Sequence, residues 1–153
     1  MKARDIMTSN PSSCHPKDKL CSAIDIMREN NVGVVPVTDG AGGGHLVGII
    51  TDRDVALSLG AEEKACSQLN VESCMSKQIF SCQPDDDIKK VEQIMKEHQV
   101  RRVPVVDRNG TLQGIIATAD IAREALREKQ SGQVELPETD LAEVVEVVSM
   151  SSD

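Results

Sequence analysis

Residues 46–54, with the sequence LVGIITDRD, turn an apolar run directly into the start of a helix. The run is rich in β-branched residues and too short for a helix, which predicts a buried strand. Gly48 within it predicts that another group approaches the backbone closely. Thr51 and Asp54 follow at the N-terminus of the predicted helix, where unpaired N–H groups and the helix dipole favour anions and acceptor oxygens. This turn can therefore hold a polar ligand.

The same stretch recurs later in the chain. Residues 112–120, with the sequence LQGIIATAD, repeat the Gly-Ile-Ile core, and Asp120 follows Gly114 as Asp54 follows Gly48. The flanking segments also match at a displacement of 68 residues: Asp5-Ile6-Met7-Thr8 with Ser73-Cys74-Met75-Ser76, Pro16 with Pro84, and Val34-Val35-Pro36-Val37 with Arg102-Val103-Pro104-Val105. The chain thus contains an internal repeat, which decides its architecture.

Each repeat predicts the order strand, helix, strand, strand, helix. The first helices have apolar faces at helical spacing, formed by Leu20, Ala23, Ile24 and Met27 in one repeat and by Ile88, Val91 and Met95 in the other. The second helices are expected at about residues 53–59 and 119–129. Because proline cannot donate to a strand ladder, the two proline-containing strands are expected at sheet edges or strand ends.

Composition restricts the partners. The net charge is −8, and the chain has one Phe and no Tyr or Trp. Nucleic acids and anionic membranes require a basic surface, and single-stranded nucleic acid also stacks on aromatic side chains, so neither partner is expected. Residues 131–153 contain six acidic residues and no Lys or Arg, which leaves the rest of the chain nearly neutral.

The cysteine pattern and the absence of a leader favour the cytoplasm. Five cysteines, at positions 14, 21, 66, 74 and 82, show no metal-binding spacing, and we expect them to act as small buried hydrophobic residues. The apolar runs are far shorter than the ~20 residues of a membrane span. No histidine pair has the spacing of metal ligands, so no metal site is expected. We therefore expect a soluble cytoplasmic protein.

These doubled and ordered motifs resemble the tandem CBS-domain pair, or Bateman module, over about residues 1–128. The resemblance implies an α/β fold of two β-α-β-β-α CBS repeats packed with pseudo-twofold symmetry. It gives repeat 1 as residues 1–66, repeat 2 as 67–130, and an acidic tail at 131–153. In the tail, Leu141, Val144, Val145 and Val148 fit one face of a short helix, and disorder is the alternative.

The resemblance also implies a function and a site. Such pairs bind adenosine-containing ligands in the cleft between the repeats, which here points to AMP, ADP or ATP, with NAD or S-adenosylmethionine as further options. The matching motif assigns Asp54 to the ribose hydroxyls and Thr51 to ribose or phosphate. In the second repeat Asp120 is retained, but Ala117 stands at the hydroxyl position and Thr118 is shifted by one. The family also forms homodimers and regulates effector proteins. A second copy of this chain and an effector protein are therefore the expected partners.

Further candidates surround these two turns. Arg101 and Arg102 replace Gly33 and Val34 of the first repeat, and their planar guanidinium groups suit phosphate; a solvated charge at a strand edge is the alternative. Arg53 is a weaker candidate for the same role. Met7 is expected first in the core and second beside an adenine ring. Thr8 of the opening motif completes the predicted ligand-binding set.

Two alternatives stay open. Thr51 and Asp54 also fit a capping box, which needs no ligand, although Asp120 without a hydroxyl partner favours the ribose role. A constitutive dimerisation or interaction module with no ligand is the alternative function. A nucleotide hydrolase would be a third class, but no nucleophile and base occur at recognisable spacing, so an enzyme and a required cofactor are not expected.

Overall fold

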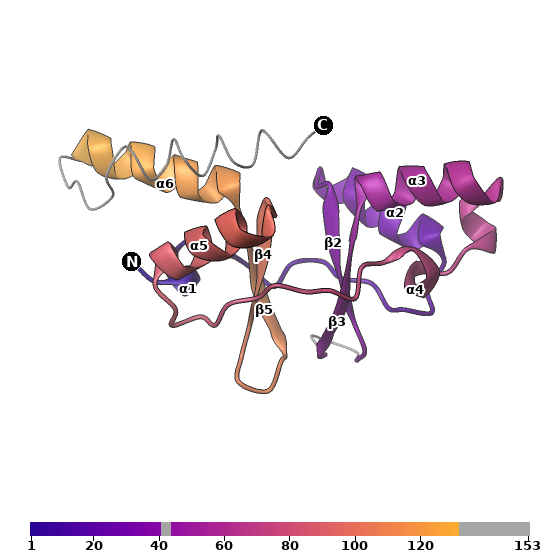
Figure 1. The fold of residues 1–153 in the computed structure, drawn as a ribbon, viewed down its shortest axis with the longest axis horizontal. Coiled ribbons are helices and arrows are strands. Elements are labelled where there is room, and N and C mark those ends of the chain that lie inside the picture. Colours follow the sequence, from indigo (N-terminus) through magenta and orange to yellow (C-terminus); the bar gives the residue numbers. More distant parts are fainter. Residues whose placement is uncertain (41–43, 132–153) are drawn as a thin grey trace. The chain divides into compact units, whose positions relative to one another are not determined.

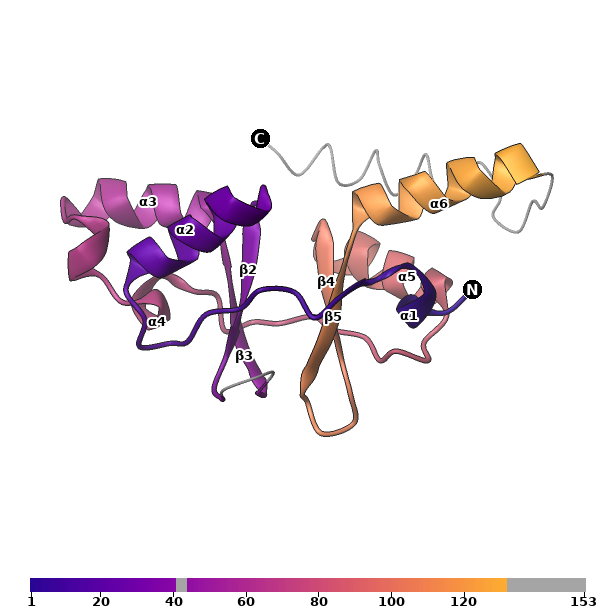
Figure 2. The same cartoon turned by 180° about the vertical axis from the view of Figure 1, so that it is seen from behind.

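The computed structural model describes residues 1–40 and 44–131, and these form two compact units. Unit 1 contains residues 1–9, 80–107 and 113–131, and unit 2 contains residues 10–79 and 108–112. Both units mix helices with strands (Figures 1 and 2). The fold is therefore of the mixed α/β class that the sequence predicts. The predicted helix in residues 131–153 lies outside the described residues, apart from Ser131.

Unit 2 is built around one antiparallel strand pair. Its elements are α2 (Leu20–Asn30), β2 (Val34–Thr38), β3 (Leu46–Thr51), α3 (Asp52–Glu62), the 3-10 turn η1 (Cys66–Gln68) and α4 (Val71–Cys74). Val34 pairs with Thr51 and Pro36 with Ile49 in the β2–β3 ladder. The fully buried core side chains include Leu20, Val35, Val37, Ile50 and Val71. The strand pair ends at Thr51, where α3 begins, so the predicted ligand-binding turn lies at the edge of this core.

Unit 1 has the same plan with one more strand. Its elements are α1 (Ala3–Ile6), β1 (Thr8–Ser9), α5 (Ile88–His98), β4 (Arg102–Val106), β5 (Leu112–Ala117) and α6 (Thr118–Ser131). The strand order is β1-β5-β4, and Thr8 pairs with Ile115. Ile88, Val91 and Met95 of α5 are buried, as their helical spacing predicts. The proline-containing strand β4 lies at the edge of this sheet, which confirms the prediction for that strand.

Each repeat contributes its opening segment to the core formed by the other repeat. Ala3 and Val71 occupy equivalent positions of the two repeats, and both are fully buried. However, Ala3 packs in the core with the helix and strands of repeat 2, and Val71 packs in the core with those of repeat 1. The repeats predicted at 1–66 and 67–130 thus describe the sequence, whereas each compact unit draws on both of them.

The glycine of each Gly-Ile-Ile core lies in close contact with a methionine side chain of the other repeat. A Cβ atom on Gly48 would lie 2.5 Å from the sulfur of Met75, and one on Gly114 would lie 2.5 Å from the sulfur of Met7. The close approach that Gly48 predicts is therefore made by a methionine side chain. Met7 accordingly has a packing role, as first expected, because it covers β5.

Gly114→Ala should destabilise the protein more than Gly48→Ala. The three atoms nearest to a methyl group at position 48 all belong to the flexible Met75 side chain, whereas a methyl group at position 114 also lies 3.0 Å from the backbone carbonyl oxygen of Thr8. Overpacking of this kind costs ~1–3 kcal/mol. Urea unfolding measures the difference, and equal midpoints for the two variants would contradict the prediction.

Four of the five cysteines form two pairs of different kinds, and the fifth, Cys74, is a half-buried free thiol. Cys14 and Cys82 are each only 2% exposed and lie in the two cores, as expected for small hydrophobic residues. The same expectation is wrong for Cys21 and Cys66, because they form a disulfide. Their separation of 45 residues in the sequence gives no spacing signal that predicts this pair. Within the described ranges, no helix has the length and apolar character needed to cross a bilayer.

Candidate functional site

The turn between β3 and α3 holds Asp54 in a defined position. Its Oδ2 atom accepts hydrogen bonds from the backbone N–H and the hydroxyl of Thr51, both at 2.8 Å. The Asp54 N–H in turn contacts Thr51 Oγ1 at 3.2 Å. The capping box considered above is therefore present. It orients the carboxylate at the positive end of the α3 dipole.

The capping box leaves one oxygen of Asp54 available. Within residues 1–40 and 44–131, no side chain or backbone group donates to Asp54 Oδ1 in a hydrogen bond that the geometry identifies. Asp54 is half-buried, and the bonds to its Oδ2 atom fix the direction of the second oxygen. A fixed carboxylate oxygen can accept hydrogen bonds from the hydroxyl groups of a ligand, and charge-assisted hydrogen bonds of this kind are the strong ones. Capping and ligand binding are thus compatible roles for Asp54.

The equivalent turn of unit 1 holds Asp120 in a related way. Asp120 Oδ2 accepts from the Ala117 backbone N–H at 2.8 Å, which reproduces half of the Thr51–Asp54 box. Asp120 lacks a hydroxyl partner, as expected, but it still caps the start of α6, because the backbone N–H makes this bond without a hydroxyl. Its Oδ1 accepts from Arg123 Nη1 at 3.2 Å. The second carboxylate oxygen is thus occupied in unit 1 and open in unit 2.

Thr118 does not replace the missing hydroxyl partner of Asp120. Its Oγ1 donates to the Arg101 carbonyl oxygen at 3.1 Å, and its N–H donates to the same oxygen at 3.0 Å. In unit 2 the corresponding bond runs from the Asp52 N–H to the Gly33 carbonyl oxygen at 3.1 Å. In unit 1 these bonds join the residue before β4 to the first residue of α6, and in unit 2 the bond joins the residue before β2 to the first residue of α3. Thr118, Arg101 and Asp120 are therefore neighbours in unit 1.

The other predicted residues divide between the two units. Arg101 is exposed and Arg102 is half-buried at the start of β4, both in unit 1. Arg53 is exposed in the first turn of α3, beside Asp54 in unit 2. Thr8 lies on β1, exposed and paired with Ile115. The structure thus brings Thr51, Asp54 and Arg53 together in unit 2, and the other predicted residues all belong to unit 1.

Two features of these turns were missed by the sequence reasoning. Arg123 follows Asp120 by three residues, and this helical spacing brings an acid and a base together. The spacing alone could have predicted the pair. The close contact between Gly33 and Asp52 was also not predicted: a Cβ atom on Gly33 would lie 2.8 Å from an Asp52 carboxylate oxygen. In unit 1 the residue that corresponds to Asp52 is Thr118. An arginine is accommodated there at position 101, which corresponds to Gly33.

No candidate metal centre accompanies the two turns. Among residues 1–40 and 44–131, no group of three or more His, Cys, Asp and Glu side chains could hold a metal ion. Phe80 and His98 stack face to face, with ring centroids 3.6 Å apart. The chemistry of the described turns is consequently that of carboxylate acceptors, hydroxyl groups and guanidinium donors.

Comparison with known proteins agrees with this geometry. The CBS domain matches residues 3–60 and again residues 71–127. The CBS domain-containing protein YhcV of Bacillus subtilis is 34% identical over 129 residues, which cover 84% of this chain and 89% of YhcV. This chain therefore belongs to the CBS domain family, and it carries two repeats of the domain. Proteins built on a CBS pair are generally regulatory rather than catalytic.

Three solved structures share this fold. A CBS pair solved with 5′-methylthioadenosine and S-adenosyl-L-methionine has a TM-score of 0.74 and 27% identity, covering 84% of this chain and 98% of that chain. The AMP complex of CBSX2 has a TM-score of 0.71 and 28% identity, with the same coverage. Hypoxic Response Protein I, solved with two coordinated zinc ions, has a TM-score of 0.71 and 32% identity, covering 80% of this chain and 98% of its own. Two of these three proteins thus bind adenosine-containing ligands.

Proposed function

We propose that this protein is a regulatory CBS pair that binds an adenosine-containing ligand through the β3–α3 turn of unit 2. The observation that carries the proposal is the Asp54 carboxylate, which Thr51 fixes through one oxygen while the other stays open. A ribose presents two adjacent hydroxyl groups that can donate to such an oxygen. The known AMP and S-adenosylmethionine complexes of similar CBS pairs support this ligand class.

The residues around the turn favour a ligand that carries phosphate. Arg53 is exposed one residue before Asp54, and its guanidinium group can donate two parallel hydrogen bonds to a phosphate. Unit 1 offers Arg101, whose carbonyl oxygen is bonded to Thr118 at the start of α6, and Arg102, the next residue, for the same purpose. AMP, ADP and ATP are therefore the proposed ligands, ahead of S-adenosylmethionine, which carries no phosphate. NAD also carries phosphate and is the further option. Asp120 is the weaker ribose acceptor of the two because Arg123 occupies its second oxygen.

The regulatory output requires a partner. A ligand changes the activity of an effector only when it binds one conformation more tightly than another. We propose that the protein acts as a cytoplasmic homodimer whose ligand occupancy is sensed by a separate effector protein. It has no catalytic role in this proposal. The alternative is a constitutive dimerisation module that binds no ligand.

Isothermal titration tests the proposal. AMP, ADP, ATP, NAD and S-adenosylmethionine are each titrated into purified protein from which nucleotides have been removed by unfolding and refolding. Saturable binding of at least one adenine nucleotide is the expected result. Circular dichroism establishes that the refolded protein is native. No heat of binding for any of the five compounds at millimolar concentration would overturn the proposal in favour of the ligand-free module.

A further inference from the structure

The disulfide of unit 2 joins two elements that are distant in the sequence. Cys21 lies in the first turn of α2, and Cys66 is the first residue of η1, with 5.1 Å between their Cα atoms. Both residues are half-exposed, so a reductant in solution can approach them. Exposed disulfides are the ones that are reduced most readily, and in a reducing compartment disulfides generally have redox roles.

The disulfide holds a segment that has few other attachments. Within residues 64–68 the hydrogen bonds are local: the Gln68 N–H donates to the Ala65 carbonyl oxygen, and the Ala65 N–H donates to Gln68 Oε1, both at 2.9 Å. Attachment to α2 by hydrogen bonds begins only at Leu69, whose carbonyl oxygen accepts from the Leu20 N–H at 2.9 Å. Reduction would therefore release residues 64–68 and leave the segment from Leu69 onward in place.

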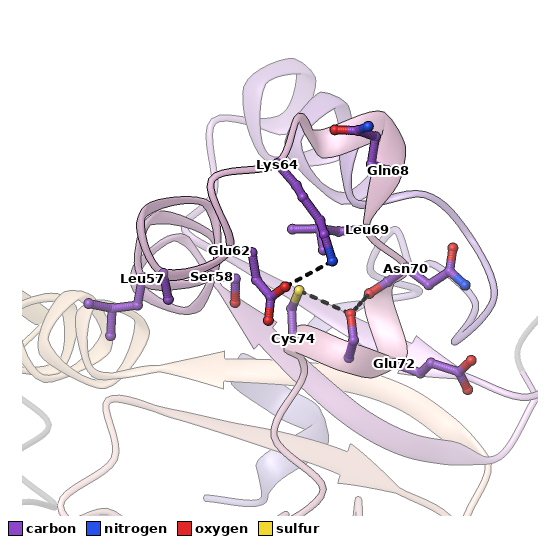
Figure 3. Close-up of a pocket in the computed structure, with 11 residues that line it drawn as sticks. Leu57, Ser58, Glu62, Lys64, Gln68, Leu69, Asn70, Glu72 and Cys74 are labelled. Atoms are coloured by element: carbon purple, nitrogen blue, oxygen red, sulfur yellow. Dashed lines mark hydrogen bonds and ion pairs between the residues drawn. The ribbon is translucent and has the colours of Figure 1, made fainter.

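The released segment forms one wall of a pocket. The pocket has a volume of about 600 Å³ and lies between α3, the η1 segment and α4 (Figure 3). Lys64, Gln68 and Leu69 line it on the side of the segment, and Cys74 lines it from α4. The Lys64 ammonium group points toward the Glu62 carboxylate at the end of α3, 3.0 Å away. Leu69 is anchored in the core of unit 2, whereas Lys64 and Gln68 belong to the segment that the disulfide ties to α2 through Cys66.

We propose that Cys21 and Cys66 form a redox switch that controls access to this pocket. In the reducing step a dithiol attacks one sulfur of the disulfide, and the other sulfur leaves as a thiolate that takes up a proton. The second thiol of the reductant then closes the reductant's own disulfide and frees the remaining cysteine. A small-molecule disulfide reverses the reaction. The oxidised form keeps residues 64–68 against α2, and the reduced form lets this wall move away from Cys74.

Cys74 provides the measurement because it is the free thiol that lines the pocket. The two other free thiols are silent at about pH 8, where thiolates are the reactive species. Burial and the nearby Asp18 raise the pKa of Cys14 to about 12, and burial and Asp86 raise the pKa of Cys82 to about 11. Labelling at either of them would therefore report opening of a core rather than of the pocket.

The test measures how fast iodoacetamide labels Cys74 in the full-length protein, by peptide mass spectrometry. Oxidised protein is compared with protein reduced by dithiothreitol and with the double variant Cys21→Ser, Cys66→Ser. Reduction and the double variant are both expected to accelerate labelling of Cys74 at least ~10-fold, as local opening does when its population rises by that factor. Dithiothreitol should have no effect on the rate in the double variant, which serves as the control.

Three outcomes would overturn the proposal. The first is an unchanged Cys74 rate after reduction of the wild-type protein. The second is labelling of Cys14 and Cys82 together with Cys74, since that indicates unfolding of the units. The third is a failure of the Cys21–Cys66 disulfide to form under oxidising conditions or to be reduced without denaturant. The wild-type comparison decides the matter even if the double variant does not fold. No step requires nucleotide binding, so this result is independent of the proposed function.

Discussion

Asp54→Asn is expected to weaken binding of the adenine nucleotide by ~10–100-fold, because the variant loses charge-assisted hydrogen bonds to the ribose. Asparagine is the informative replacement. Its carbonyl oxygen can still accept from the Thr51 N–H, so the start of α3 is largely preserved, whereas Asp54→Ala also removes the Asp54 half of the capping box. The effect on affinity can then be separated from the effect on folding.

Two matched variants make this prediction specific. Thr51→Ala breaks the side-chain half of the capping box but retains the Asp54 carboxylate, and it should lose less affinity than Asp54→Asn. Asp120→Asn makes the same change in unit 1, where Arg123 already contacts the carboxylate, and should have the smaller effect of the two aspartate variants. Titration calorimetry gives all three affinities. Unchanged affinity in Asp54→Asn would remove the β3–α3 turn as the ribose site, even if the wild-type protein binds nucleotide.

Val71→Asp is expected to unfold unit 2. In the sequence Val71 belongs to repeat 2, but its side chain packs with the helix and strands of repeat 1. Val71 is 0% exposed and packs in the core of unit 2. An uncompensated charge at a fully buried position costs ~3–5 kcal/mol, which is a large part of the stability of a small domain. Ala3→Asp is the equivalent change in the other repeat, and it should unfold unit 1 instead.

Hydrogen exchange measured on peptides distinguishes the two cases. In Val71→Asp the amides of β2 and β3 should lose protection, and in Ala3→Asp those of β4 and β5 should do so. The exposed neighbours Glu72 and Arg4 supply the controls, because Glu72→Asp changes a solvated side chain and Arg4→Lys keeps the positive charge beside Asp85. If Val71→Asp affects β4 and β5 but spares β2 and β3, the assignment of residue 71 to unit 2 is incorrect.

Local patterns predicted most of the elements, because each depends on neighbouring residues. Helical spacing identified α2 and α5, and the apolar run before Thr51 identified β3 and the start of α3. The exchange of opening segments could not be predicted in this way, since Ala3 and Val71 are equivalent in sequence and either core would accept a small apolar side chain. The Cys21–Cys66 pair also depends on tertiary proximity, which five cysteines without recognisable spacing do not reveal.

The candidate site shows the same division. The order Gly-Ile-Ile-Thr-x-x-Asp was sufficient to predict that Thr51 and Asp54 meet at a helix start, because the strand and the helix share that turn. Whether each carboxylate keeps an open oxygen was beyond the sequence pattern. That property depends on the Arg123 side chain in unit 1 and on the absence of such a bond at Asp54 among the described residues. The two aspartates thus look alike in sequence and differ in available hydrogen-bonding capacity.

The exchange of Ala3 and Val71 bears on how such a chain could have arisen. In a single repeat expressed alone, the opening segment would not pack in the core of its own repeat. That core would also lack the opening segment that the other repeat supplies. Two copies of that fragment could satisfy both needs by swapping segments between chains. An ancestral single-repeat polypeptide would on this view have been an obligate swapped pair, and fusion of duplicated genes would have made the swap intramolecular and independent of concentration.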